Sequence, residues 1–397
     1  MRKFTLVMAG LLAVSTLAVA QKKKEKKDEG YQFTDIVRLD CTPVKSQDNA
    51  GTCWSWSGNS FLESEMIRMG KKPVEIAPLF TVWNAYSAKA EKYVRLHGKC
   101  NFSQGGAFAD VTWSMKNFGL VPLSVYSGLN YGEDVHAHGE MEAVLKAYVD
   151  AIVKNENGRL STAWKRGYDA VLDAYLGEKP ETFEYEGKTY TPMSFAKEYC
   201  GLNADDYISV TSFTHHPYYT SFAIEVEDNW LNEMSYNIPL DEFIELCDKA
   251  LDNGYTFAWG TDCSETGFTR TGLAVAPDMN AQITKGNEAA KWVDMPRAQF
   301  AQEMLKAPMP QIKVTPELRQ AGYDNYQTTD DHGMHIIGKA VDQNGTKYFI
   351  VKNSWGSDIA YGGYWYATYE FFAHKTLNIM IHKDALSAEL KAKLGIK

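Results

Sequence analysis

The sequence predicts an α+β fold in which a helical subdomain, built around a buried helix, packs against a twisted antiparallel β-sheet. One helix is predicted from Cys53 toward Arg68, where glycine and proline residues follow. Near the C-terminal end, a turn signal of the Asn-Gly type at 342–345 separates two stretches, one beginning at His332 and one leading to Asn353. Two strands joined there would bring these two side chains to one end of the sheet.

The predicted helix begins within the motif Q-D-N-A-G-T-C-W-S-W, which runs from Gln47 to Trp56. A cysteine at a helix N-terminus lies at the positive end of the helix dipole, which favours the thiolate over the thiol. We therefore expect Cys53 to be a nucleophile that is ionised at neutral pH. Such a nucleophile needs a base and a group that orients the base. His332 and Asn353 are the candidates for these two roles.

The spacing between His332 and Asn353 constrains the hairpin. If residues 344–345 formed a plain two-residue loop, Asn353 would lie opposite Ile336, roughly 13 Å from His332 along the strand. The two side chains could not then meet. We predict that either an asymmetric turn or a β-bulge shifts the register.

The order Gln, Cys, His, Asn, with the motifs G-T-C-W, H-G-M and N-S-W-G, resembles the papain-like cysteine peptidases. Three further stretches resemble the bleomycin hydrolase and aminopeptidase C branch of that family. They are S-Q-G-G at 103–106, K-N-F-G-L-V-P at 116–122 and F-A-W-G-T-D at 257–262. The resemblance covers most of the chain from about Phe33 onward.

The resemblance implies hydrolysis of peptide bonds through a thioester acyl-enzyme, without a cofactor. Cys53 would be the nucleophile, and His332 would act as general base and then as general acid. Asn353 would hold the His332 ring, and Trp355 would shield that hydrogen bond from water and is also a candidate substrate-binding residue. Gln47 would donate its side-chain amide to the oxyanion, together with the Cys53 backbone N–H.

Two further segments are candidates for substrate binding. Gly105 and Gly106 could let an extended substrate approach and pair as an added strand, or could simply form a turn. Asp262 could lie in a substrate pocket or in a structural turn. His335 competes with His332 but should point to the opposite face of the strand.

Three functions stay open: an aminopeptidase, an endopeptidase with an open cleft, and a catalytically idle peptide-binding relative. All four catalytic candidates are present, which argues against the third. In the branch that the chain resembles, a C-terminal arm meets the substrate's amino group and the subunits form a hexameric ring. The chain ends shortly after a charged helix predicted over 383–394, so we expect neither the arm nor the ring, although some homo-oligomer remains an alternative.

The N-terminal segment predicts export. Residues 1–20 have the features of a signal peptide, with a charged start, an apolar core and an A-x-A site at 18–20. The core is shorter than the roughly 20 residues of a membrane span, so we expect no membrane anchor and a periplasmic or secreted protein. Residues 21–32 form a charged linker and 33–397 the peptidase domain. The net charge of −9 and the lack of another basic cluster argue against nucleic-acid binding.

Within this domain, a largely helical insertion is expected at about 132–240, and the sheet bearing His332 and Asn353 at about 255–380. Further helices are expected over 77–97, 111–118, 140–155, 162–176, 240–251 and 287–306, a hairpin over 182–190 and a loop-rich stretch over 308–329. The six cysteines do not predict a disulfide scaffold. The pairs His136/His138 and His215/His216 invite a metal interpretation, but no zinc motif accompanies them and we expect no metal.

Overall fold

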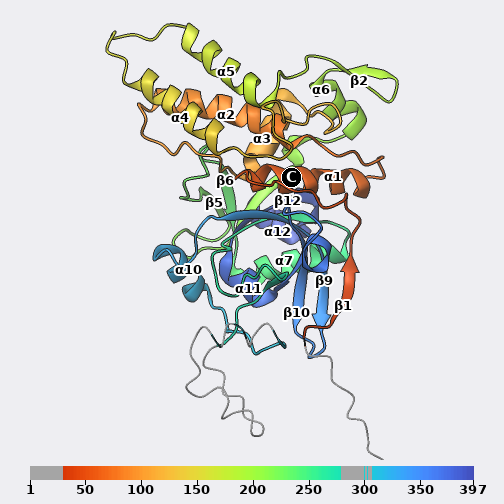
Figure 1. Ribbon diagram of the computed structural model, residues 1–397. Coiled ribbons are helices and arrows are strands. Elements are labelled where there is room, and N and C mark those ends of the chain that lie inside the picture. The colour runs from red at the N-terminus through yellow and green to blue at the C-terminus, as the bar shows by residue number, and fades with distance from the viewer. Residues whose placement is uncertain (1–29, 279–298, 300–301, 303–305) are drawn as a thin grey trace, which may run out of the picture.

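The computed structural model describes residues 30–278, 299, 302 and 306–397. Two lobes are visible in Figure 1, one built from helices and one from a large sheet. The predicted signal peptide and most of the linker lie outside the described residues, as does nearly all of the helix expected over 287–306.

The described helices are, in chain order, α1 (Cys53–Arg68), α2 (Pro78–Arg95), α3 (Phe108–Phe118), α4 (Gly139–Val153), α5 (Ala163–Leu176), α6 (Pro192–Ser194), α7 (Leu240–Asp252), α10 (Pro316–Asp324), α11 (Tyr369–Lys375) and α12 (Ala388–Leu394). The strands are β1 (Phe33–Arg38), β2 (Phe183–Tyr185), β3 (Lys188–Tyr190), β4 (Tyr207–Thr211), β5 (Thr220–Ala223), β6 (Met234–Asn237), β7 (Phe257–Thr261), β8 (Leu273–Ala274), β9 (His332–Asp342), β10 (Lys347–Lys352), β11 (Tyr364–Thr368) and β12 (Thr376–His382).

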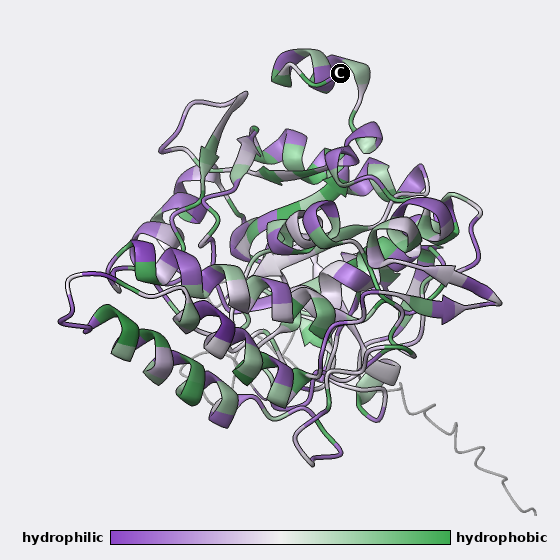
Figure 2. Cartoon of the chain, turned by 90° about the horizontal axis from the view of Figure 1, so that it is seen from above, coloured by the Kyte–Doolittle hydropathy of each residue, from purple (hydrophilic) through white to green (hydrophobic). Residues whose placement is uncertain are grey.

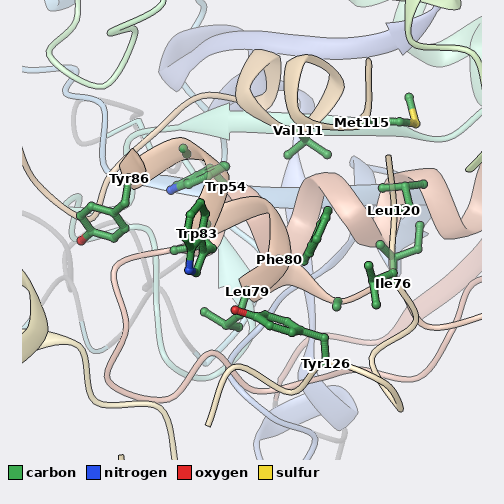
Figure 3. Close-up of a cluster of buried hydrophobic side chains, with 14 of the residues drawn as sticks. Trp54, Ile76, Leu79, Phe80, Trp83, Tyr86, Val111, Met115, Leu120 and Tyr126 are labelled. Carbon is green, nitrogen blue, oxygen red and sulfur yellow. The ribbon is translucent and has the colours of Figure 1, made fainter. Parts of the chain in front are cut away.

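Helix α1 is the centre of the helical lobe. Its residues from Trp54 to Met66 are all buried, because α2 and α3 cover one side and β9 the other. Figure 3 shows the packing on the helical side, where Trp54 of α1 lies near Trp83 of α2 and Val111 of α3 lies above them. A helix that is buried all round does not need an amphipathic stripe. This explains why only an incomplete stripe is visible in its sequence.

The large sheet has the strand order β5-β6-β4-β12-β7-β9-β10-β11-β8, and β1 pairs with β9. Most neighbouring strands are antiparallel, as predicted, but β4 pairs with β6 and β8 with β11 in parallel. Strands β4 and β6 are parallel because β5, which comes between them in the sequence, lies at the outer edge of the sheet. The chain then returns through residues 224–233, so that β6 runs beside β4 in the same direction.

The hairpin of β9 and β10 uses both of the predicted register devices. Asp342 and Thr346 close a loop of 343–345, in which Gly345 has a φ of +85°. A β-bulge then places Val351 opposite Ile336 after Ile350 has faced Gly338. Each device moves the register by one residue, so the prediction is confirmed.

The outer helices alternate polar and apolar residues along their length, as the view from above shows (Figure 2). This is the pattern of helices that cover a core on one side and meet solvent on the other. Among the described helices, none combines the length and the apolar character that crossing a bilayer requires.

Candidate active site

Cys53 is the first residue of α1, and its side chain faces the sheet lobe. The Gly333 backbone N–H lies 3.4 Å from its Sγ and donates toward it. A Cβ at residue 333 would approach the Ser57 hydroxyl to 3.0 Å and the Phe108 ring to 3.1 Å. Glycine at this position therefore lets β9 come close to the N-terminus of α1, which brings the thiol next to the start of the strand.

His332 is the first residue of β9 and is buried. Its Nε2 lies 2.7 Å from Asn353 Oδ1, which also accepts a hydrogen bond from the Ser354 N–H. Because Oδ1 is an acceptor, Nε2 carries the hydrogen, and Nδ1 is left as the basic nitrogen. The Trp355 ring stacks on the imidazole with 4.8 Å between centroids. Trp355 thus covers the His332–Asn353 pair and does not line the cleft.

Burial acts against the charged form of both groups. It raises the pKa of the Cys53 thiol to about 12, with smaller contributions from Asp330 and Asp228 in the same direction. Burial also lowers the pKa of His332 to about 4. An isolated charge on either group is therefore disfavoured, and a thiolate at Cys53 would need the positive charge of His332 beside it.

Gln47 is buried beside the hairpin end. Its Nε2 donates to the Ala50 carbonyl at 2.7 Å, and its Oε1 accepts from the Ser354 hydroxyl at 2.6 Å. The amide thus fixes the turn that leads into α1. It is held between that turn and the residue following Asn353, and one of its two N–H bonds remains for another acceptor.

Cys53 and His332 line the same cleft between the lobes. The wall on the helical side includes Gly106 and the start of α3. The wall on the sheet side is contributed by β4, β6, β7, the segment before His332 and the residues between β5 and β6. The whole lining is Cys53, Trp54, Gly106, Ala107, Phe108, Ala109, Ser209, Ile224, Val226, Asp228, Asn229, Glu233, Ser235, Gly260, Asp330, Asp331, His332, Gly333, Leu377 and Asn378.

The Gly105–Gly106 segment lies along this wall, and other residues pack closely against the Cα atoms of both glycines. A Cβ at Gly105 would come within 2.0 Å of Asp228 Oδ2, and one at Gly106 within 2.5 Å of Asp110 Oδ2. The preceding residue, Gln104, accepts from the Gly51 N–H at 2.7 Å through its side chain. The glycines are therefore required by close packing, and Gln104, which sequence reasoning missed, ties them to the loop before Cys53.

Asp262 does not line the cleft, which corrects its assignment as a substrate-binding residue. Its side chain is buried and accepts from the N–H and hydroxyl of Ser264, both at 2.8 Å. Lys375 lies 3.6 Å from the carboxylate. Because these partners enclose it, Asp262 forms the structural turn that was its alternative.

A buried polar network behind the site was also missed. Glu63 of α1 accepts from Lys45 Nζ at 2.7 Å, from the Ile76 N–H at 2.7 Å and from the Thr42 hydroxyl. Lys352, next to Asn353, donates to the Thr42 hydroxyl at 3.0 Å. The network joins α1 to the last residue of β10, so it fixes the distance between the two lobes at the site. Only the fold brings these residues together.

The remaining cysteines and histidines take structural positions. All six cysteines are free thiols. His335 is buried against α1, 3.0 Å from the Ser60 hydroxyl. His136 packs edge-on to Trp56, and His138 next to it is fully buried. In the parts of the chain that the structure describes, no three metal-binding side chains come together.

Both ring nitrogens of His138 are buried and without a partner among the described residues. Burial lowers the pKa of this histidine to about 4, whereas in the unfolded chain the pKa of the same side chain is about 6.5. Between these values only the unfolded state binds the proton, so stability falls as pH falls. We expect the free energy of unfolding to drop by about 2 kcal/mol from pH 7 to 5 on this account.

Urea unfolding of His138→Leu should show a correspondingly flatter dependence on pH than the parent protein. His97→Asn, a change on the exposed end of the helical lobe, is the control and should leave the pH dependence as it is. An unchanged slope in His138→Leu would contradict the prediction.

Asn353→Ala should lower kcat by about 10- to 100-fold, with a smaller effect on KM, because the His332 ring loses the acceptor that orients it. Asn353→Asp keeps an acceptor and should retain more activity. Its negative charge should also raise the pKa of His332 and move the acidic limb of the pH–rate profile upward. Equal activity in the parent and Asn353→Ala would show that Trp355 alone positions the ring.

Comparisons with known proteins cover most of the chain. The model of the peptidase C1-like family matches residues 87–284 and 310–396. Aminopeptidase C of Lactococcus lactis subsp. cremoris is 23% identical over 397 residues, covering 88% of this chain and 83% of the relative. Aminopeptidase C of Lactobacillus delbrueckii subsp. lactis is 24% identical over 414 residues, covering 94% and 86%.

Two more distant comparisons extend the picture. Mitochondrial cysteine proteinase 1 of Saccharomyces cerevisiae (strain ATCC 204508 / S288c) is 19% identical, covering 95% of this chain and 82% of the relative. The crystal structure of PepW from Lactobacillus rhamnosis HN001 superposes with a TM-score of 0.67 at 20% identity, covering 91% of this chain and 84% of that one. This similarity of structure shows that the two chains share a fold.

Proposed function

Because the chain belongs to the peptidase C1-like family and is a papain-like cysteine peptidase, we propose that it is an exported aminopeptidase of the bleomycin hydrolase type. The observation that supports this most directly is the arrangement around His332. Asn353 holds one ring nitrogen at 2.7 Å, and the ring shares a cleft with the thiol of Cys53. The names of the aminopeptidase C relatives support the choice of the amino end.

In the proposed mechanism, Cys53 and His332 start as a neutral pair. Sγ attacks the carbonyl carbon of the scissile bond while its proton passes to Nδ1 of His332. The Cys53 backbone N–H and the free N–H of Gln47 stabilise the oxyanion. His332 then protonates the departing amine, which leaves a thioester. Water hydrolyses the thioester, with His332 again taking the proton, and the thiol is restored.

The proposal is tested with one fluorogenic peptide series whose amino end is either free or acetylated. We expect hydrolysis of the free-amino peptides, and its loss after alkylation of the enzyme with iodoacetamide. Cleavage of the acetylated peptides at a similar rate would identify an endopeptidase instead. Absence of alkylation-sensitive cleavage in both sets would leave the idle peptide-binding relative as the better description.

Export is tested separately, in the native host. We expect the mature protein to begin at Gln21, after cleavage behind Ala20, and to be found outside the cytoplasm. Intact-mass analysis of the purified protein and cell fractionation would check this. A mature protein that retains Met1 to Ala20 and fractionates with the cytoplasm would contradict the proposal.

A further inference from the structure

Residues 224–233 connect β5 to β6 and reach from the sheet lobe to the helical lobe; we call them the cleft strap. Trp230 of the strap is buried among the side chains of the helical lobe. Its indole N–H donates to Asp110 Oδ2 at 2.7 Å, and its ring packs edge-on to Trp113 at 5.9 Å. Lys92 Nζ donates to the Trp230 carbonyl. The strap is therefore tied to both lobes and crosses the space between them.

The strap is also held in one shape by its own residue Asn229. The Asn229 side-chain N–H groups donate to the carbonyls of Ile224 and Glu233, both at 3.1 Å, and its Oδ1 accepts from the Glu233 N–H at 2.9 Å. Asn229 is only 9% exposed. These three hydrogen bonds lie within the strap, so its own residues hold its shape.

The strap forms one end of the cleft that contains Cys53. Its residues Ile224, Val226 and Asp228 line the cleft, and the Asp228 carboxylate lies directly against Gly105, next to the Gly106 wall. A peptide extended along that wall would therefore meet the strap. The strap thus limits the length of chain that can extend past the scissile bond on this side, as an exopeptidase requires.

The charge at this end of the cleft selects which peptide terminus fits. Four carboxylates line the cleft, and among the described lining residues there is no lysine or arginine. They are Asp228, Glu233, Asp330 and Asp331. Burial raises the pKa of Asp330 to about 8, so the negative charge of the lining rests on the other three side chains, which repel a terminal carboxylate and attract a terminal ammonium group.

Asp228 is the best placed of these carboxylates. It lies directly against Gly105, where any side chain would collide with it. Among the described residues, its one hydrogen-bond donor is Asn101 Nδ2 at 3.4 Å, whereas a carboxylate can accept about four such bonds. Asp331, in contrast, already accepts from the backbone N–H groups of Cys263 and Ser264.

The surrounding charges leave Asp228 free to bind a cation. The nearest buried lysine, Lys89, donates to the carbonyls of Ser103 and Gly105. Its charge acts on both Asp110 and Asp228 and lowers the pKa of each, against the larger effect of burial. The single positive charge of Lys89 therefore acts on two carboxylates, Asp110 and Asp228. A second positive charge, supplied by a ligand, would balance the negative charge that remains.

We propose that Asp228 binds the free α-amino group of the peptide substrate, and that the cleft strap stops the chain there so that residues are released from the amino end. This inference rests on the proposed peptidase function. It assigns amino-end recognition to a side chain within the domain, placed beside the wall along which the substrate lies.

The test is Asp228→Asn, which keeps the shape and the Asn101 contact but removes the charge. Its activity is measured on a free-amino peptide and on the same peptide acetylated. We expect kcat/KM for the free-amino peptide to fall by about 10- to 100-fold, mainly through KM. Hydrolysis of the acetylated peptide should stay the same or increase. Asp228→Glu, which restores the charge, should recover part of the loss.

Glu227→Gln is the matched control, because Glu227 is the exposed neighbour and does not line the cleft. It should leave both kinetic constants within twofold. Iodoacetamide should still label Cys53 in all variants, which checks that the site is intact; because Asp228 raises the pKa of the Cys53 thiol, the labelling of Asp228→Asn should be no slower than that of the parent protein. Unchanged KM for the free-amino peptide in Asp228→Asn would overturn the proposal. Absence of Cys53-dependent cleavage in the parent protein would instead overturn the proposed function.

Discussion

Cys53→Ala should lower peptide hydrolysis by at least about 10⁴-fold, because it removes the thiol that shares the cleft with His332 and would form the acyl-enzyme. The five other cysteines do not line the cleft. The variant should remain folded, since Sγ accepts only weak backbone hydrogen bonds, such as the one from the Gly333 N–H at 3.4 Å. The measurement is kcat/KM on a free-amino fluorogenic peptide with highly purified protein.

Cys100→Ala is the matched control, since Cys100 is another partly buried free thiol that lies in the helical lobe outside the cleft. It should retain activity within twofold. Mass spectrometry after brief treatment with iodoacetamide should place the inactivating label on Cys53. If Cys53→Ala kept more than a hundredth of the activity, Cys53 would not be the nucleophile.

Glu63→Ala should reduce the free energy of unfolding by about 3–5 kcal/mol. Glu63 is fully buried and is the carboxylate that balances Lys45 and Lys352 in the network behind the site. Its removal leaves buried ammonium groups without compensation, and it also leaves the Ile76 N–H without an acceptor. A loss of this size is a large part of the stability of an ordinary protein. Urea denaturation at pH 7 measures it.

The loss in Glu63→Ala should become smaller when the pH is raised from 7 to 9. Burial lowers the pKa of Lys352 to about 8, so this lysine becomes neutral in the folded state within that range. A neutral amine no longer needs the carboxylate. Glu75→Ala is the control, because Glu75 also approaches Lys45, at 3.7 Å, but is largely exposed. It should cost no more than about 1 kcal/mol. Equal losses in the two variants would contradict the prediction.

The elements that could be predicted from the sequence are those with local signals. Helix α1 runs from Cys53 to Arg68, as expected from its flanking glycine and proline, and the hairpin around 182–190 has Gly187 in its turn. Strand β12 was not identified as a separate strand, although it lies in the middle of the sheet and mostly within the range predicted for it. Nearly all of its side chains are buried, so its place is defined by its neighbours in the sheet.

Two errors have tertiary causes. Helix α10 lies in the stretch expected to be loop-rich, because its sequence is polar and its stability depends on Arg319, which is buried and donates to the carbonyls of Ser212 and Ala373. In the helix expected over 77–97, the sequence predicts Leu96 as a core residue together with Tyr86 and Tyr93; it is instead 42% exposed, since α2 ends just before it.

The candidate site was only partly accessible from the sequence. Cys53, His332 and Asn353 could be identified because each lies in a distinctive motif, and the register of the hairpin could be reasoned out from the need for His332 and Asn353 to meet. Asp228 and Glu63 have no such motif. Their positions depend on contacts between segments far apart in the chain, which only the folded structure supplies.

The hairpin of β9 and β10 also limits how this protein can vary. The loop 343–345 lies at the far end of the hairpin from His332, on the surface, where length changes are usually tolerated. Deleting or inserting one residue there would exchange the two faces of β10 relative to β9 and move Asn353 away from the imidazole. A natural variant with a different loop length should therefore carry a second insertion or deletion at the bulge near Ile337. The second change would restore the register between His332 and Asn353.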